Sequence, residues 1–189
     1  MADIVSNAPV ISGTSGGDSI TGGDADNTIS AGSGNNVVKA GGGNDTVYGG
    51  SNSDDIDGQG GDDVLRGGSS KDKLVGGDGD DYVNGGGGDD RLYGGDGSDI
   101  IIGGIGNDVL RGGASDQLDG DVDYFSFGTA DGTDKVFNFE NDLDKIYLSD
   151  IGSASFTYAS GNTIMSYGST VVIFYNSILD AGDISATLP

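Results

Sequence analysis

Aspartate recurs every nine residues between Gly13 and Arg111, and this spacing is the feature of the sequence with the clearest chemical meaning. The stretch divides without a gap into eleven nonapeptides, of which GGDGDDYVN and GGIGNDVLR are clear copies. Asn27 and Asn36 take the sixth position in two copies, and a later approximate copy, DGDVDYFSF, supplies Asp123 in the same role. In the other nine copies the sixth residue is an aspartate: Asp18, Asp45, Asp54, Asp63, Asp72, Asp81, Asp90, Asp99 and Asp108.

The composition narrows the chemistry of these carboxylates to the binding of hard cations. The chain of 189 residues has 31 acidic and 8 basic side chains, a formal net charge of −23, and neither Cys nor His. Zinc centres built on Cys or His, and Ser-His-Asp or Cys-His nucleophiles, are therefore impossible. The negative charge repels phosphate, so we expect no nucleic-acid partner. Ca²⁺, which takes about six to eight oxygen ligands, fits better than Mg²⁺, which keeps its waters.

The elements that position these carboxylates follow from the rest of each nonapeptide. The eighth residue is always aliphatic, and its two neighbours complete a short strand in which only the middle side chain faces inward. The glycines before it allow a tight turn. Two nonapeptides then make one coil of 18 residues with a strand on each side. The predicted fold is all-β, a parallel β-roll of two sheets.

Stacked coils bring sixth-position residues together at a spacing of 18, in two rows. Asn52 and Ser70 replace glycine at the fourth position, which makes the pair of Asp54 with Asp72 the doubtful one. Ala25 and Asn27 depart from the pattern together, so we expect that turn to bind nothing. About six good cation sites are predicted, at Asp54/Asp72, Asp72/Asp90, Asp90/Asp108, Asp45/Asp63, Asp63/Asp81 and Asp81/Asp99. The alternative is a metal-free coil in which the aspartates only cap turns.

These motifs closely resemble the repeats-in-toxin (RTX) family, whose nonapeptide is G-G-x-G-x-D-x-U-x with a large apolar residue at U. The resemblance covers residues 13–127 and implies calcium binding, with backbone carbonyls of the glycine turns completing each site. It divides the chain into a lead-in at 1–12, the β-roll at 13–127, and a C-terminal cap at 128–189.

The segment after the repeats reads as further β structure. We expect short strands at 135–139 and 145–149, and antiparallel strands within 154–176 with turns near Gly161 and Gly168. This part is predicted to close the open end of the coil, because an exposed strand edge invites aggregation.

Two features of the C-terminal part leave alternatives open. Asp131, Asp134, Asp142 and Asp144 either form one more cation site or serve turns. The tail SILDAGDISATLP resembles the uncleaved C-terminal signals recognised by type I exporters, although it ends in Pro189 where many relatives end in an acid followed by apolar residues. No stretch approaches the length of a transmembrane helix.

The fifth-position acids Asp26, Asp62, Asp80 and Asp89 are expected to be solvated rather than direct ligands.

The side chains flanking the aliphatic position differ between the two sheets. One outer face carries paired charges, from Lys39, Asp55, Asp57, Lys73, Arg91 and Arg111. The other carries an apolar stripe that either packs against the C-terminal segment or binds a partner, made of Thr28, Thr46, Tyr48, Val64, Tyr82, Ile100 and Ile102.

The expected function is a secreted calcium-binding β-roll that folds on Ca²⁺ outside the cell, without catalysis, with a role at a surface, in the matrix or toward a host. Repeats and cap occupy nearly the whole chain, which leaves little room for a catalytic domain. An alternative is a carbohydrate-binding accessory module like those of alginate epimerases, using Tyr48 and Tyr82. An Asp/Asp glycosidase is less favoured because no pocket outside the repeats is evident.

Overall fold

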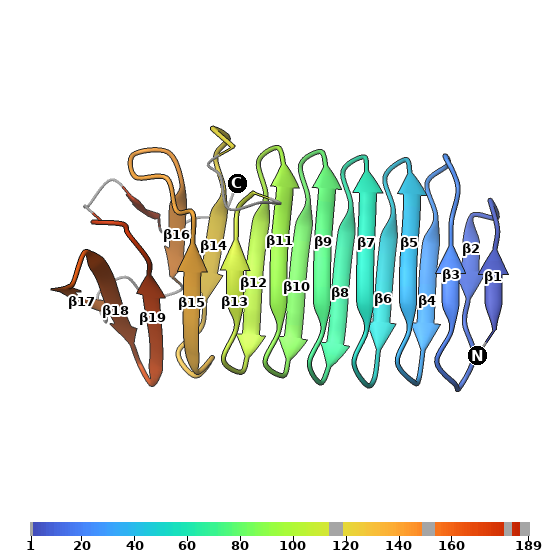
Figure 1. Ribbon diagram of the computed structural model, residues 1–189, viewed down its shortest axis with the longest axis horizontal. Helices are drawn as coiled ribbons and strands as arrows, with labels where there is room; N and C mark the ends of the chain where they lie inside the picture. The colour runs from blue at the N-terminus through green and yellow to red at the C-terminus, as the bar shows by residue number, and fades with distance from the viewer. Residues whose placement is uncertain (1, 114–118, 149–153, 180–182, 186–189) are drawn as a thin grey trace.

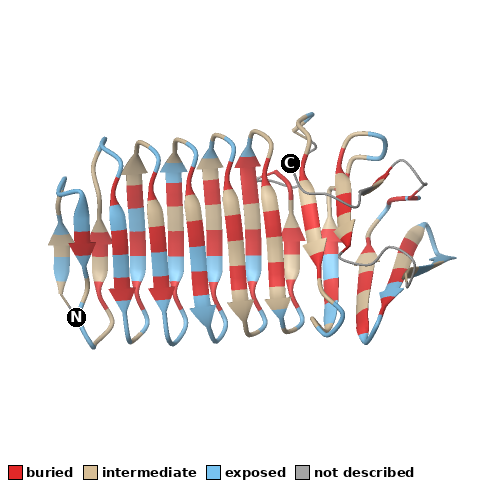
Figure 2. Ribbon diagram, turned by 180° about the vertical axis from the view of Figure 1, so that it is seen from behind, coloured by how far each residue is buried: buried red, intermediate tan, exposed pale blue. Residues whose placement is uncertain are grey.

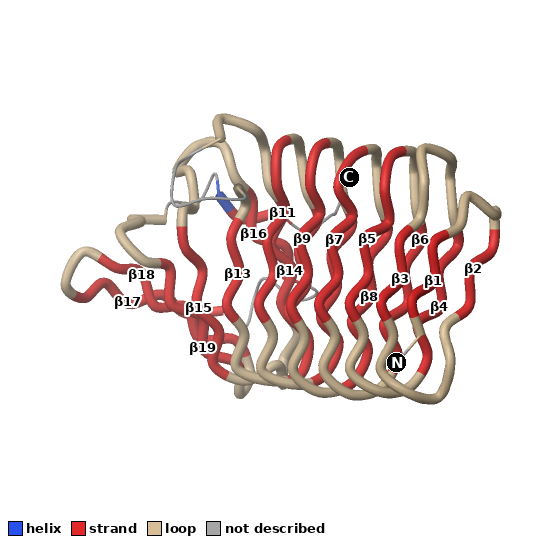
Figure 3. The backbone as a smooth tube through the Cα atoms, turned by 45° about the vertical axis from the view of Figure 1, so that its right-hand side comes forward, coloured by secondary structure: helices blue, strands red, loops and turns tan. Residues whose placement is uncertain are grey.

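The computed structural model describes residues 2–113, 119–148, 154–179 and 183–185, and its strands stack into a long two-sheet coil (Figure 1). Sheet A is ordered β1-β3-β5-β7-β9-β11-β13-β15-β19-β18-β17 and sheet B is ordered β2-β4-β6-β8-β10-β12-β14-β16-β20. From β1 to β16, successive strands enter alternate sheets, and the turns connect the two sheets at both edges of the coil (Figure 3). The predicted parallel β-roll is confirmed.

The strands of sheet A have short, regular bounds within the repeats. They are Asp3–Val5 (β1), Ser19–Thr21 (β3), Val37–Gly42 (β5), Asp55–Gly60 (β7), Lys73–Asp78 (β9), Arg91–Asp96 (β11), Val109–Arg111 (β13), Thr133–Phe137 (β15), Thr170–Phe174 (β19), Asn162–Tyr167 (β18) and Ala154–Ala159 (β17). Those of sheet B are Val10–Ser12 (β2), Thr28–Gly32 (β4), Thr46–Gly50 (β6), Val64–Ser69 (β8), Tyr82–Gly87 (β10), Ile100–Ile105 (β12), Tyr124–Phe127 (β14), Lys145–Leu148 (β16) and Ile184–Ser185 (β20).

The register of the coil follows directly from the nonapeptide. Leu74 pairs with Leu92 in sheet A, and Leu65 pairs with Val83 in sheet B, so equivalent residues stack at a spacing of 18. The eighth-position residues are buried in the core between the sheets. Buried residues recur as red bands along the strands in Figure 2. All eighth-position residues are at most 1% exposed: Ile20, Ile29, Val38, Val47, Ile56, Leu65, Leu74, Val83, Leu92, Ile101 and Leu110.

The parallel pairing extends past both boundaries predicted from the repeats. Before Gly13, β1 pairs with β3 and β2 pairs with β4, so residues 3–12 form a first coil rather than a lead-in. Beyond 127, β13 pairs with β15 and β14 with β16, both in parallel. The nonapeptide pattern stops marking coils here because the turns lengthen while the strands keep their register. The sequence pattern loses its phase after Arg111, and Asp116 and Leu118, which would fit it only if one residue were deleted, lie outside the described residues.

The C-terminal strands lie close to their predicted places. β15 begins and ends two residues before the expected 135–139, β16 lies within the expected 145–149, and β17, β18 and β19 form an antiparallel meander. β19 pairs in parallel with β15, so the meander extends sheet A. Phe174 lies edge-on to Phe127 and Phe139 and fills the end of the core. In the tail, β20 pairs with β16, while residues 180–182 and 186–189 lie outside the described residues.

Candidate metal centres

The sixth-position side chains form two buried rows, each at the point where a turn leads into a strand. In the first row each residue directly precedes a strand of sheet A: Asp18, Asn36, Asp54, Asp72, Asp90 and Asp108. In the second row each residue directly precedes a strand of sheet B: Asn27, Asp45, Asp63, Asp81 and Asp99. Every predicted aspartate ligand is at most 3% exposed. Burial of a carboxylate is unfavourable unless hydrogen bonds or a cation compensate its charge, so the partners of each oxygen decide what the rows can do.

One oxygen of each carboxylate is bonded to the neighbouring coil. Oδ1 of Asp81 accepts the backbone N–H of Asp63 at 2.7 Å, and Oδ1 of Asp99 accepts that of Asp81 at 2.8 Å. The same bond, at 2.6–2.8 Å, joins each residue from Asp45 to Asp108 to the row member 18 residues earlier. These bonds fix the side chains in place. They are the turn-capping bonds expected if the coil binds no metal.

The second oxygen has no such bond. Within the described part of the chain, the following buried Oδ2 atoms have no hydrogen-bond partner, and we call them the open oxygens: those of Asp45, Asp54, Asp63, Asp72, Asp81, Asp90, Asp99, Asp108 and Asp134. Buried polar atoms are nearly always satisfied in folded proteins. A regular series of exceptions therefore points to a ligand rather than to a local defect.

The glycine at the first position of each nonapeptide keeps a space beside the open oxygen. A Cβ placed on Gly76 would lie 2.1 Å from Oδ2 of Asp81 and 2.5 Å from the carbonyl oxygen of Gly94. A Cβ on Gly94 would lie 2.0 Å from Oδ2 of Asp99 and 2.5 Å from the carbonyl oxygen of Gly112. A carboxylate oxygen and a carbonyl oxygen thus face the same small space in successive turns. This is the donor set that Ca²⁺ prefers.

Burial raises the pKa of nearly all the row carboxyls. It raises the pKa of Asp90 to about 6 and that of Asp99 to about 9, and hydrogen bonds from the neighbouring coil only partly oppose the effect. Burial likewise raises the pKa to about 7 for Asp63, Asp72, Asp81 and Asp108. The ionised rows are therefore costly at neutral pH without a positive counter-charge.

The first member of each row, at the N-terminal end of the coil, differs from the members in the middle. Oδ1 of Asp18 accepts the backbone N–H of Ala2, and its Oδ2 accepts both the N–H and the hydroxyl of Thr14. These backbone hydrogen bonds lower the pKa of Asp18. Asp18, a predicted ligand, would have to give up these bonds to bind a cation. Asn27 resembles it, since its side-chain amide donates to the carbonyl of Ala8 and accepts from Gly23.

Three aspartates beyond the eleven unbroken nonapeptides continue the rows. Asp99 donates its N–H to Oδ1 of Asp123, Asp108 donates to Oδ1 of Asp134, and Asp123 donates to Oδ1 of Asp144. Burial raises the pKa of Asp123 to about 8 and those of Asp134 and Asp144 to about 7. Sequence reasoning places only Asp123 in a row. The usable signal was local, an aspartate followed by x-U-x, as in Asp134-Lys-Val-Phe and Asp144-Lys-Ile-Tyr.

The four C-terminal acids do not form one site. Asp134 lies in the first row and Asp144 in the second, on the sides of different sheets. Asp131 instead accepts the N–H of Gly128, and the N–H of Asp142 donates to Asp183. Nowhere in the described ranges do three acidic side chains gather closely enough to hold a metal ion by themselves. A cation in the rows therefore needs backbone carbonyls as well.

Asp54 and Asp72, the pair that the sequence leaves in doubt, are arranged like the other row aspartates. Asn52 and Ser70 adopt φ angles of 73° and 76°, in the left-handed region that glycines occupy at the same position of other turns. Asp54 and Asp72 both present open oxygens. The substitutions therefore alter backbone strain without moving the carboxylates out of the row.

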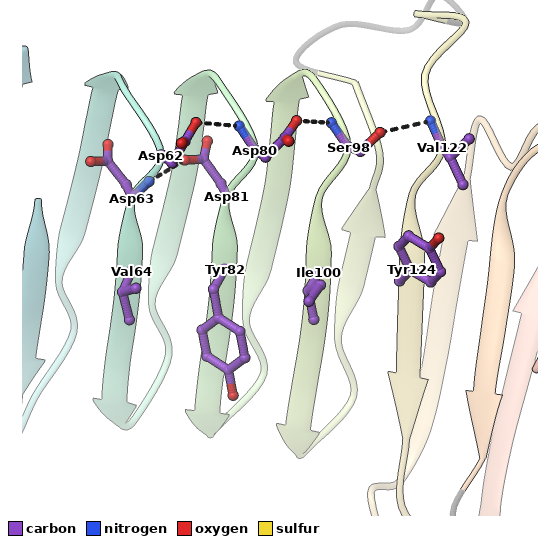
Figure 4. Close-up of a pocket in the computed structure, with 10 residues that line it drawn as sticks. All are labelled: Asp62, Asp63, Val64, Asp80, Asp81, Tyr82, Ser98, Ile100, Val122 and Tyr124. Carbon is purple, nitrogen blue, oxygen red and sulfur yellow. Dashed lines mark hydrogen bonds between the residues drawn. The ribbon is translucent and has the colours of Figure 1, made fainter. Parts of the chain in front are cut away.

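The fifth-position acids are exposed, and several also bond to the next coil (Figure 4). Asp62 accepts the N–H of Asp80, which in turn accepts the N–H of Ser98 at 2.8 Å. These acids border a groove of about 540 Å³ on the outer face of sheet B. Its other walls include four apolar or aromatic side chains at paired positions of successive strands: Val64, Tyr82, Ile100 and Tyr124.

The outer faces of the two sheets carry different side chains. Lys73 and Asp55 form an ion pair at 3.0 Å on sheet A. On sheet B the guanidinium of Arg66 lies 5.8 Å from the ring centre of Tyr48 and 5.2 Å from that of Tyr82. The described C-terminal strands continue the two sheets instead of packing on this stripe. No helix in the described ranges is long and apolar enough to cross a membrane.

Comparisons with known proteins agree with this geometry. The crystal structure of the extracellular lipase LipA from Serratia marcescens matches with a TM-score of 0.50 and 15% identity over 95% of this chain. The chain spans 40% of the length of that lipase chain, so the likeness concerns the fold alone. No curated protein sequence matches the chain significantly. The RTX calcium-binding nonapeptide repeat matches residues 10–38, 30–65, 57–92, 66–101, 84–116 and 93–123, more than half of the sequence, and the chain belongs to this family.

Proposed function

We propose that this protein is a secreted, non-catalytic calcium-binding β-roll whose folding is driven by Ca²⁺ outside the cell. The observation that supports it most strongly is the regular series of open oxygens in the two buried rows. The proposed side-chain ligands are the row aspartates from Asp45 to Asp108, together with Asp123. Carbonyls of the glycine turns complete sites at about six adjacent pairs, and further sites toward the ends are weaker.

Bound Ca²⁺ would supply the positive charge that the buried rows lack. Without it, the fold must hold several carboxylates in an environment that disfavours their ionised form. One aliphatic side chain per nonapeptide makes a thin core, which leaves little hydrophobic stabilisation to oppose that penalty. Because the paired ligands meet only in the folded coil, binding and folding are coupled.

Two arguments support the proposed location: the affinity typical of extracellular calcium modules, and the sequence of the C-terminal tail. Extracellular calcium modules bind at roughly 10⁻⁴ to 10⁻³ M, so such a chain stays unfolded in a calcium-poor cytoplasm and folds outside. The segment 177–189 resembles a type I export signal and is proposed to engage that secretion apparatus. An unfolded chain suits passage through an exporter.

The test is far-UV circular dichroism during a Ca²⁺ titration of metal-free protein, with Mg²⁺ as the control. We expect a cooperative gain of β signal with Ca²⁺ and not with Mg²⁺. A β spectrum that is already complete without metal, and unchanged by Ca²⁺, would exclude calcium-driven folding.

A second candidate function is carbohydrate binding on sheet B. The groove beside Tyr82 and Tyr124 combines aromatic faces with polar groups, as ligand sites do. Asn84 donates to the hydroxyl of Tyr82 at 3.3 Å and holds it at the surface. Retention of calcium-loaded protein in polysaccharide gels tests this idea. Tyr82→Ala should abolish retention, while Tyr93→Ala on sheet A should not, and equal retention of both variants would reject the sheet B site.

A further inference from the structure

The turn at residues 128–134 lies beyond the last matched repeat yet reproduces the backbone pattern of a repeat turn. Gly106 forms a parallel bridge with Gly132, and the N–H of Gly106 donates to the carbonyl of Asp131 at 2.6 Å. The equivalent bond one coil earlier runs from Gly88 to Ile105 at 2.7 Å. Gly132 has a φ of 119°, as glycines at the fourth position have. Thr129–Phe137 therefore occupies the place of a nonapeptide whose first two glycines are replaced.

Asp134 fills the ligand position of this hidden repeat. Its Oδ1 accepts the N–H of Asp108 at 3.0 Å, and the carbonyl of Asp108 accepts the N–H of Lys135 at 2.9 Å. In the preceding coil the same two bonds join Asp90 to Asp108 and Val109. Asp134 is 0% exposed, and its Oδ2 is an open oxygen like that of Asp108. Two unsatisfied, buried carboxylate oxygens thus belong to adjacent turns, although 26 residues separate them.

The second row provides a contrast at the same end of the coil. Asp144 also accepts the N–H of its row neighbour, Asp123, through Oδ1. However, its Oδ2 accepts the backbone N–H of Glu140 at 2.8 Å. Asp144 is buried and in register but has both oxygens bonded to the chain. A position at the end of a row therefore does not by itself leave an oxygen open. The open oxygen of Asp134 distinguishes it from Asp144.

We propose that Asp108 and Asp134, with backbone carbonyls of their two turns, form an additional Ca²⁺ site outside the recognised repeats. The inference rests on the proposed function, because it extends the same row of ligands by one turn. The site uses a non-repeat segment that no nonapeptide pattern marks.

This site also joins the antiparallel meander to the roll. The hydroxyl of Thr170 donates to the carbonyl of Gly128 at 2.7 Å and accepts the N–H of Asp131 at 2.8 Å. The N–H of Ser169 donates to the carbonyl of Thr129 at 2.9 Å. The turn between β18 and β19 thus rests on the proposed calcium turn. Ca²⁺ bound there orders the surface on which the meander docks.

The experiment counts bound Ca²⁺ per chain by native mass spectrometry of folded protein. We expect Asp134→Asn to bind one Ca²⁺ fewer than wild type, and Asp144→Asn, the matched control, to bind the wild-type number. Hydrogen exchange at saturating Ca²⁺ should show faster exchange in β18 and β19 for Asp134→Asn only. An unchanged count in Asp134→Asn overturns the inference, whereas a wild-type protein that binds no Ca²⁺ overturns the proposed function.

A second measurement does not depend on a variant that folds. Crystals of wild-type protein grown with Ca²⁺ can be examined by anomalous scattering. A peak between the carboxylates of Asp108 and Asp134 supports the site. Peaks in the repeat turns with none at this position would overturn it.

Discussion

Oδ1 of Asp81 accepts the backbone N–H of Asp63 at 2.7 Å, while Oδ2 of Asp81 is buried with no hydrogen-bond partner among the described residues. In the folded coil, this hydrogen bond fixes the orientation of the side chain, so the orientation does not depend on a cation alone. The bond also links each turn to the next, because the donor N–H belongs to the residue that carries the adjacent carboxylate.

Asp81→Asn tests the open oxygen alone, since asparagine keeps an acceptor for the N–H of Asp63 but loses the charge. We expect the Ca²⁺ concentration at the midpoint of folding to rise about tenfold, the loss of one interaction with a charged group. Circular dichroism during a Ca²⁺ titration measures it. Asp80→Asn is the matched control, because the exposed Asp80 also accepts one backbone N–H. Equal shifts in the two variants would assign the effect to general charge.

The stability of metal-free protein should fall as pH rises. Burial raises the pKa of Asp99 to about 9 and that of Asp123 to about 8, above the value of 3.8 for an unburied carboxyl. The folded state then binds more protons than the unfolded chain, so its stability is greatest at acid pH and is lost as pH rises through these values. Far-UV circular dichroism of the metal-free protein at pH 5 and pH 8 measures the difference, with the larger β signal expected at pH 5.

Saturating Ca²⁺ should reverse this dependence. The ligands must be ionised to bind the cation, so protons compete with Ca²⁺ and the calcium-loaded protein is more stable at pH 8 than at pH 5. Urea unfolding at the same two pH values, with Ca²⁺ in excess, provides the comparison. The same sign of pH dependence with and without Ca²⁺ would argue against competition at the rows.

Gly94→Ala should destabilise the coil through the space beside Asp99. The added Cβ would lie 2.0 Å from Oδ2 of Asp99 and 2.5 Å from the carbonyl of Gly112, so the turn must shift. Overpacking of this kind costs about 1–3 kcal/mol of unfolding free energy. Gly60→Ala is the control, because a Cβ there meets nothing within 4 Å. Thermal unfolding of calcium-loaded protein compares them, and a harmless Gly94→Ala would contradict the steric argument.

Ser70→Gly should stabilise the protein, and Asn52→Gly should do so less. Both residues have left-handed φ angles, which cost an ordinary residue roughly 1–2 kcal/mol but are tolerated by asparagine. The gain is partly offset by the greater freedom of glycine in the unfolded chain. Ser53→Gly, at a position without a positive φ, should give no gain. Urea unfolding ranks the three variants, and a gain at Ser53 equal to that at Ser70 would exclude relief of strain.

The sequence alone determined the coil and most members of its two carboxylate rows. A strict nonapeptide fixes which residues stack, because strands alternate faces and two repeats close one coil. Asp54 and Asp72 are paired by their spacing of 18 alone, and the eighth-position aliphatics are assigned to the core in the same way. The period is a local property of the sequence, so these assignments need no knowledge of which distant segments are in contact.

Only the tertiary structure decided what happens where the period fails. Asp134 and Asp144 share the same local motif, yet one keeps an open oxygen and the other bonds Glu140. The parallel pairing of β1 with β3, of β13 with β15 and of β14 with β16 likewise occurs where no nonapeptide marks a strand. Asp18, which holds the same position of the nonapeptide as the other row aspartates, has both carboxylate oxygens bonded to Ala2 and Thr14. The partners of a buried oxygen depend on the path of neighbouring turns, and turn length is not encoded by the period.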